Sequence, residues 1–185
     1  GTFVVMYSGN HGFSTPIKTV LDAALLLQDD TSMEFIFIGG GVGKQLVNDT
    51  IESQDPTNVR SLPYQPFETL RYSLSAADVH LVSVGDDVVG VVHPCKIYGA
   101  MAVGRPILLL APDPCHASDL VRDNKIGWHI PHGDVEGAKR VLEEIRATPA
   151  DMLREMGQRA QDTIRREFSK AQLCGRFCDE VEEKS

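Results

Sequence analysis

The chain has 185 residues, of which 42% are hydrophobic, and its formal net charge is -8 at pH 7. This length and apolar content predict one domain with one well-buried core. The acidic balance disfavours nucleic-acid binding, which needs a face rich in Lys and Arg. No run approaches the roughly 18 apolar residues that cross a bilayer, and no basic segment of a signal peptide opens the chain, so we expect a cytoplasmic protein.

Short apolar runs alternate with helical patterns along the chain, and the runs are nearly continuous, as in strands covered on both faces. The alternation predicts βαβ units and an α/β fold, a Rossmann-like, doubly wound parallel six-stranded sheet with helices on both faces. The predicted strands are residues 3–7, 34–38, 59–62, 79–82, 107–110 and 127–130.

Capping patterns predict where several helices begin. A Thr-Pro pair at 15–16, read as an N-cap followed by a first-turn proline, opens a predicted helix over 17–27. A second pair at 148–149 opens one running to about Arg166. Capping-box spacing further on predicts a separate last helix from Lys170.

Ligands of an open parallel sheet bind beyond the carboxyl ends of its strands. The first such loop carries Gly9, Asn10 and Gly12, and its glycines allow a close approach to a phosphate beside a helix N-terminus. An ordinary surface turn is the competing interpretation of this loop.

The second loop, GGGVGK at 39–44, resembles phosphate loops without matching one. Gln45 stands where a Walker A motif needs Ser or Thr, and Lys44 stands where a dinucleotide loop needs its third glycine. We expect a tight turn here that forms at most one wall of a cleft.

The third loop leads through Gly90 and His93 to Pro94, which we expect at the first position of a helix. Lys96 and Ile97 follow in the first turn, where the helix dipole disfavours a cation unless an anion binds there. An exposed surface lysine is the alternative. His93 fits a phosphate contact and a helix cap equally well.

No metal site is expected. Asp86 and Asp87 form an acidic pair, but we interpret them as solvated loop residues. The four cysteines, at positions 95, 115, 174 and 178, contain no CxxC pair and have no clustered His, so we expect free thiols.

Several segments together resemble the C-terminal domain of GT-B-fold retaining glycosyltransferases, in particular the bacterial surface-polysaccharide members of family four. They are YSGNHG at 7–12, FIFIGGGVGKQL at 35–46, LPYQPFETLRYSLSAADVHLV at 62–82 and VVHPCKIYGAMAVGRPIL at 91–108. The resemblance covers essentially the whole chain, and the last segment is its most specific part.

One departure concerns the carboxylates of that last segment. Two glutamates eight positions apart are usual in the family, and here Val91 and Gly99 occupy their places. The carboxylate that grips the ribose hydroxyls is therefore absent at Gly99. The Pro-x-Lys pattern is similar to a subgroup acting on amino-deoxy sugars, in which Lys96 would take much of the phosphate contact.

The resemblance implies a donor-binding domain that takes a nucleoside-diphosphate sugar, UDP-linked in our expectation, and needs no metal or other cofactor. It implies base contacts near Leu62 and Tyr64, and a partner N-terminal domain that binds a polysaccharide or lipid-linked acceptor at the membrane surface. The abrupt start of the chain inside a strand fits that expectation. A GT-B nucleotide-sugar epimerase and a non-catalytic regulatory α/β domain are the alternatives.

Overall fold

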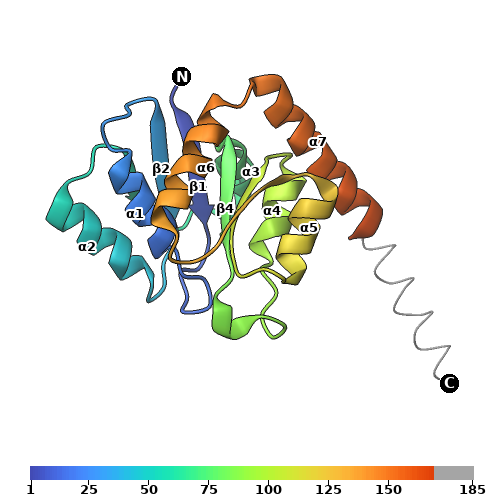
Figure 1. The fold of residues 1–185 in the computed structure, drawn as a ribbon, viewed down its shortest axis with the longest axis horizontal. Coiled ribbons are helices and arrows are strands. Elements are labelled where there is room, and N and C mark those ends of the chain that lie inside the picture. Colours follow the sequence, from blue (N-terminus) through green and yellow to red (C-terminus); the bar gives the residue numbers. More distant parts are fainter. Residues whose placement is uncertain (169–185) are drawn as a thin grey trace.

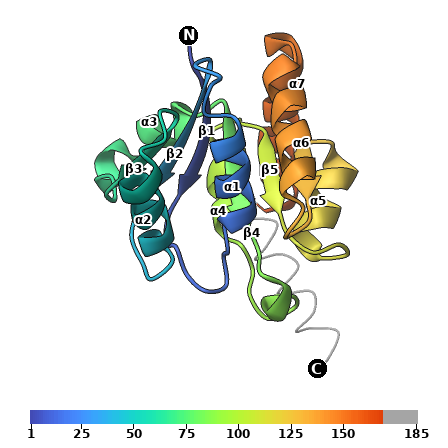
Figure 2. The ribbon, with the colours of Figure 1, turned by 60° about the vertical axis from the view of Figure 1, so that its left-hand side comes forward.

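The computed structural model describes residues 1–168 and places one parallel sheet between two layers of helices (Figures 1 and 2). The strand order is β3-β2-β1-β4-β5-β6, with every pairing parallel, so the predicted doubly wound fold is confirmed. The strands are β1 (Phe3–Ser8), β2 (Met33–Ile38), β3 (Val59–Leu62), β4 (Val79–Ser83), β5 (Ile107–Leu110) and β6 (Gly127–Ile130).

Helices connect consecutive strands, as right-handed crossovers require. They are α1 (Lys18–Leu26), α2 (Lys44–Gln54), α3 (Leu70–Ser75), α4 (Lys96–Ala102), α5 (His116–Asn124), α6 (Val135–Ala147) and α7 (Ala150–Glu167), with short 3₁₀ turns η1 (Phe67–Thr69) and η2 (Asp86–Val88). The predicted last helix from Lys170 lies outside the described residues. Within the described part, no helix is both long and apolar enough to span a bilayer.

Strand β5 shows how the sheet separates two cores. Leu108 and Leu110 face the side covered by α1 and α6, whereas Ile107 and Leu109 face α4 and α5. All four side chains are fully buried, because successive strand residues point to opposite faces and both faces are covered. This explains why the run carries no polar alternation.

The predicted helix starts were wrong by one or two residues because the capping groups have other partners. Thr15 Oγ1 accepts a hydrogen bond from the N–H of Gly12 (3.1 Å) inside the loop, and α1 begins only at Lys18. Thr148 instead closes α6, because its hydroxyl donates to the Glu144 carbonyl (2.9 Å).

Pro94 likewise lies before α4 rather than at its first position. The Pro94 carbonyl accepts a hydrogen bond from the backbone N–H of Ile97 (3.0 Å), and the Cys95 carbonyl accepts one from the backbone N–H of Tyr98 (3.2 Å). These are i→i+3 bonds of a 3₁₀ turn, so the α-helix itself begins at Lys96.

The strand order reverses between β1 and β4, which are paired only at Val5↔Val79 and Met6↔His80. After β1 the chain continues toward β2, and after β4 it continues toward β5, on the other side of the sheet. These diverging connections leave a crevice beyond the carboxyl ends of β1 and β4. The loop after β1 and the segment leading to α4 meet at this crevice.

Candidate functional site

Lys96 lies directly across Gly9 at the crevice. A Cβ atom on Gly9 would sit 2.6 Å from Lys96 Cε, which is the end of a flexible side chain, and the φ of +137° at Gly9 is a backbone conformation that favours glycine. Lys96 Nζ lies 5.3 Å from the centroid of the Tyr7 ring. The fold thus brings together the first-loop glycine and the lysine that the sequence singled out separately.

Lys96 is a half-buried cation without a compensating charge. Among the described residues, no carboxylate pairs with its ammonium group and no oxygen accepts a hydrogen bond from it. Desolvation lowers the pKa of Lys96 from its ordinary value. An anion at this position would supply the missing charge and favour the protonated form.

A cavity of about 360 Å³ extends from Lys96 between the loops and α3. Tyr64 and Gln65 line it from the segment after β3, Phe67 from η1, and Leu70 and Leu74 from α3. Sequence reasoning named Tyr64 but missed Phe67, whose side chain is 84% exposed although it is aromatic. The sequence carried no signal for Phe67, because its exposure is visible only in the structure.

The first loop offers fewer backbone donors than expected. The N–H of Gly9 donates to Ile38 O (3.0 Å), that of His11 to Gly40 O (2.8 Å), and that of Gly12 to Thr15 Oγ1 (3.1 Å). Of the four N–H groups from Gly9 to Gly12, that of Asn10 has no hydrogen-bond acceptor among the described residues. Asn10 itself is exposed.

The GGGVG loop packs backbone to backbone against the first loop. A Cβ on Gly39 would lie 2.0 Å from the Gly9 carbonyl oxygen, and one on Gly41 would lie 2.6 Å from the His11 oxygen. Gly43 N–H closes the contact by donating to His11 O (2.8 Å). The glycines therefore serve loop packing, in agreement with the tight turn that the sequence favoured.

Lys44 at the end of this loop points into the protein. Its side chain is 8% exposed, and Nζ donates to the carbonyls of Phe37 and Leu62, the latter at 3.1 Å. Burial lowers the pKa of Lys44 to about 8. Leu62, an expected base contact, thus contributes its carbonyl to Lys44, and its side chain is 40% exposed without lining the cavity.

His11 is buried beneath the same loops. Its ring is 4.4 Å from that of Tyr7, and Nε2 lies 3.3 Å from Ile38 O. Desolvation, with the nearby charges of Lys44 and Lys96, lowers the pKa of His11 to about 4. His11 is therefore neutral at pH 7 and does not add a positive charge beside Lys96.

The remaining predicted donor-binding residues line a different, smaller hollow of about 200 Å³, where Gly90, His93 and Pro94 meet His116 at the start of α5. His93 is exposed, and its Nε2 lies against the Tyr98 hydroxyl. Ile97 is fully buried in the core under α4.

The acidic pair Asp86 and Asp87 lies exposed in η2. Within residues 1–168, no three His, Cys, Asp or Glu side chains come together as metal ligands would.

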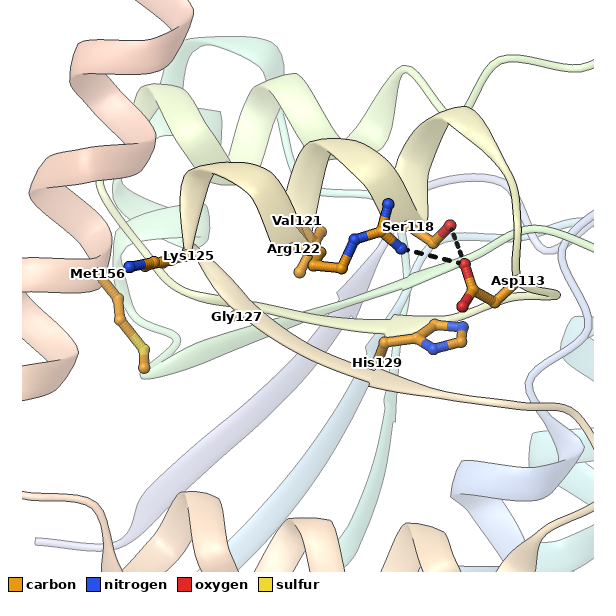
Figure 3. Close-up of a pocket in the computed structure, with 8 residues that line it drawn as sticks. All are labelled: Asp113, Ser118, Val121, Arg122, Lys125, Gly127, His129 and Met156. Carbon is orange, nitrogen blue, oxygen red and sulfur yellow. Dashed lines mark hydrogen bonds and ion pairs between the residues drawn. The ribbon is translucent and has the colours of Figure 1, made fainter.

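Another hollow, of about 360 Å³, lies between α5, β6 and α7, away from the sheet reversal (Figure 3). Its Arg122 pairs with Asp113 (3.4 Å) and with Asp119, and Ser118 Oγ donates to Asp113 (2.8 Å). The charge of Arg122 is therefore compensated inside the protein. Among the described residues, Lys125 of this hollow and Lys96 of the first cavity have no ion-pair partner, and Lys96 is the one at the sheet reversal.

Comparison with known proteins agrees with the fold. The chain is 28% identical over 145 residues to the probable glycosyltransferase WbjE of Pseudomonas aeruginosa, covering 78% of this chain and 36% of that protein. It is 29% identical over 108 residues to WcaI of Escherichia coli, a putative colanic acid biosynthesis glycosyl transferase, covering 58% and 26% of the two chains. The chain spans about a third of the length of these curated relatives.

Solved structures with the same fold include a mutant of S. aureus TarM in complex with UDP and Anabaena HepE in complex with UDP-glucose. The TM-scores are 0.78 and 0.77 at 18% and 16% identity. The matches cover 96% and 99% of this chain, and 35% and 49% of those chains. The family model described as "Glycosyl transferases group 1" matches residues 1–163, and the chain therefore belongs to this family of glycosyltransferases.

Proposed function

We propose that this chain is the donor-binding domain of a retaining glycosyltransferase that transfers a sugar from a nucleoside-diphosphate sugar, UDP-linked, to a polysaccharide or lipid-linked acceptor. The observation that carries the proposal is Lys96, a half-buried cation across Gly9 at the sheet reversal that has no ion-pair partner among residues 1–168. A diphosphate is the part of such a donor that needs this charge.

The chemistry follows from the leaving group. Cleavage of the bond between sugar and diphosphate leaves negative charge on the diphosphate, and a cation already in place stabilises that charge without reorganisation. Lys96 lies near the Tyr7 ring and across Gly9. In the described first loop, from Gly9 to Gly12, Asn10 N–H is the backbone donor without an acceptor.

The rest of the donor fits the cavity that continues from Lys96. Tyr64 and Phe67 offer aromatic faces for a base at the far wall of this cavity. Structures similar to this chain include proteins solved with UDP and with UDP-glucose, which supports a UDP-linked donor. The relatives named for polysaccharide biosynthesis support a surface-polysaccharide acceptor.

Transfer itself would need an acceptor-binding domain. Because the match covers only about a third of each relative, we propose that a second, N-terminal domain supplies it, in a cytoplasmic enzyme working at the membrane surface. The 185-residue chain would then bind the donor weakly and transfer nothing.

Isothermal titration calorimetry with UDP tests the proposal. We expect measurable binding that falls about tenfold or more in Lys96→Ala, since a hydrogen bond to a charged group contributes about 1.5–3 kcal/mol. Lys18→Ala is the matched control, because it removes an exposed lysine paired with Asp22 on α1. Equal UDP affinity in the wild type and Lys96→Ala would refute the role of Lys96.

A UDP-sugar incubated with the chain also separates the alternatives. Epimerised sugar in the product would favour the epimerase, and the absence of any nucleotide binding would favour a regulatory domain.

A further inference from the structure

His80 is a buried titratable side chain in the wall of the Lys96 cavity. It lies on β4, is 4% exposed and lines the cavity together with Leu74 and Lys96. Its Nε2 lies 2.9 Å from the carbonyl oxygen of Leu74, near the end of α3. The proposed function uses the charge of Lys96 and the aromatic rings of the far wall, and it leaves His80 without a role.

The bond to Leu74 fixes the tautomer of His80. A backbone carbonyl oxygen can only accept a hydrogen bond, so Nε2 must carry the hydrogen. Desolvation by burial lowers the pKa of His80 to about 4, so the ring is neutral at pH 7 and its other nitrogen carries no hydrogen. Nδ1 is therefore left with a lone pair, and it can accept a hydrogen bond but cannot donate one.

Nδ1 of His80 is open to the cavity and has no partner within residues 1–168. The hydrogen bond of this ring runs through Nε2, and no group in the described part of the chain donates to Nδ1. In the same part of the chain, the side-chain atoms that are both sealed from solvent and without a partner are His11 Nδ1 and Asn58 Oδ1. His80 Nδ1 is not one of them, so the open space that it touches is the cavity that His80 lines.

His80 differs from the other polar side chains of this wall. The hydroxyl of Ser8 and the amide of Gln65 are less buried, and each can donate as well as accept a hydrogen bond. They can therefore adapt to whichever group a ligand presents, and the ammonium group of Lys96 can only donate. Among the lining side chains, His80 is the one that is more than nine-tenths buried and restricted to accepting.

We propose that His80 is a specificity-determining residue of the donor site, whose Nδ1 accepts a hydrogen bond from an N–H or O–H group of the donor's nucleoside. The inference rests on the proposed function and narrows its substrate class to nucleosides that present such a group to β4. Water can pair with Nδ1 before a ligand binds. A ligand that covers Nδ1 without offering a hydrogen displaces that water and leaves a buried acceptor unpaired, which weakens its binding.

Calorimetric titration of the chain with UDP and three analogues tests the inference. N3-methyl-UDP lacks the N–H of the base, and 2′-deoxy-UDP and 3′-deoxy-UDP each lack one ribose hydroxyl. These three groups are all the hydrogen-bond donors of the uridine part, so the analogues separate the sources of the hydrogen. We expect the wild-type chain to bind one analogue about three- to tenfold more weakly than UDP, the contribution of a hydrogen bond between neutral groups.

His80→Phe separates the acceptor from a structural role. The phenyl ring is close to the imidazole in shape and offers no acceptor, so this variant should bind UDP and the discriminated analogue with affinities equal within about twofold. A merely structural role would weaken the binding of all the nucleotides by the same factor. His129→Phe is the matched control, because His129 Nε2 also bonds to a backbone carbonyl, that of Ala111 (2.7 Å), but lines the hollow beside α5. It should keep the wild-type ratios.

The possible failures bear on different claims. A wild type that binds UDP and all the analogues with equal affinity overturns the role of His80 and leaves the donor function standing. A folded His80→Phe variant that keeps the wild-type ratios also overturns it, because another group of the wall then reads the hydrogen; His80→Leu makes the same comparison if the phenyl ring prevents folding. If the wild type binds none of the nucleotides, the proposed function itself fails.

Discussion

Gly39→Ala tests whether the GGGVG loop is a packing element. The new Cβ would lie 2.0 Å from the Gly9 carbonyl oxygen and 2.9 Å from its carbon, against ordinary contacts of 3.4–4 Å, so the two loops must separate by about 1 Å or more. That movement disrupts two hydrogen bonds of 2.8 Å, from His11 N to Gly40 O and from Gly43 N to His11 O.

The cost follows from these terms. Two lost hydrogen bonds contribute about 1 kcal/mol each, and a φ of +123° imposed on alanine adds about 1–3 kcal/mol of strain. We expect the free energy of unfolding in urea to fall by about 3–5 kcal/mol, a large part of the 5–15 kcal/mol typical of a domain.

Gly133→Ala is the matched control. Gly133 also has a positive φ, +82°, but no atom lies within 4 Å of its Cβ position, so this variant carries strain without a clash. It should lose clearly less stability than Gly39→Ala. If both variants lose the same amount, or if Gly39→Ala loses less than 1 kcal/mol, the interlocked-loop explanation is wrong.

Three further predictions concern the core and its buried titratable groups. The pKa of Lys44 is lowered from 10.5 to about 8, so the unfolded chain holds more protons than the folded chain between these pH values. The free energy of unfolding should therefore rise with pH across this range, by on the order of 3 kcal/mol. Lys44→Met should abolish this rise in urea unfolding measured at several pH values from 8 to 10.5. The pKa of His80 is lowered from 6.5 to about 4 by burial, so stability should fall as the pH drops from 6.5 to 4, and the difference in stability between wild type and His80→Gln should become independent of pH above pH 7 if the reasoning holds. Leu109→Ala should cost about 2–5 kcal/mol in urea unfolding, because Leu109 is fully buried between β5 and α4; a loss below 1 kcal/mol would mean that the site collapses around the deletion.

The strands were predictable because their signal is local. Three of the six have the predicted bounds, and the other three, β1, β2 and β4, are one residue longer. Burial on both faces requires an apolar residue at almost every position, and such a run is visible without knowledge of its neighbours.

Helix starts were less predictable because a cap depends on where the capping group finds its partner. Thr15 has the residue type of an N-cap, but its hydroxyl group holds Gly12 in the first loop. Thr148 binds backward to Glu144. Both contacts are decided by the path of the chain, which a capping pattern does not contain.

The site shows the same division between local and tertiary information. Lys96 stood out in the sequence because a cation in the first turn of a helix is unfavourable by itself. Its position over Gly9, and the wall formed by Leu74 and Phe67, come from segments that only the sheet reversal brings together.

The engaged loop amides change how an anion would be held here. A phosphate loop of the usual kind distributes the charge over several free N–H groups, whereas here Gly9 and Gly12 use theirs within the protein and α4 is only seven residues long. Most of the attraction must then come from the single ammonium group of Lys96. A point charge orients a diphosphate less strictly than a cradle of amides does. In the proposed function, contacts farther along the donor, at the base and at an acceptor domain, would therefore supply the orientation that the first loop does not.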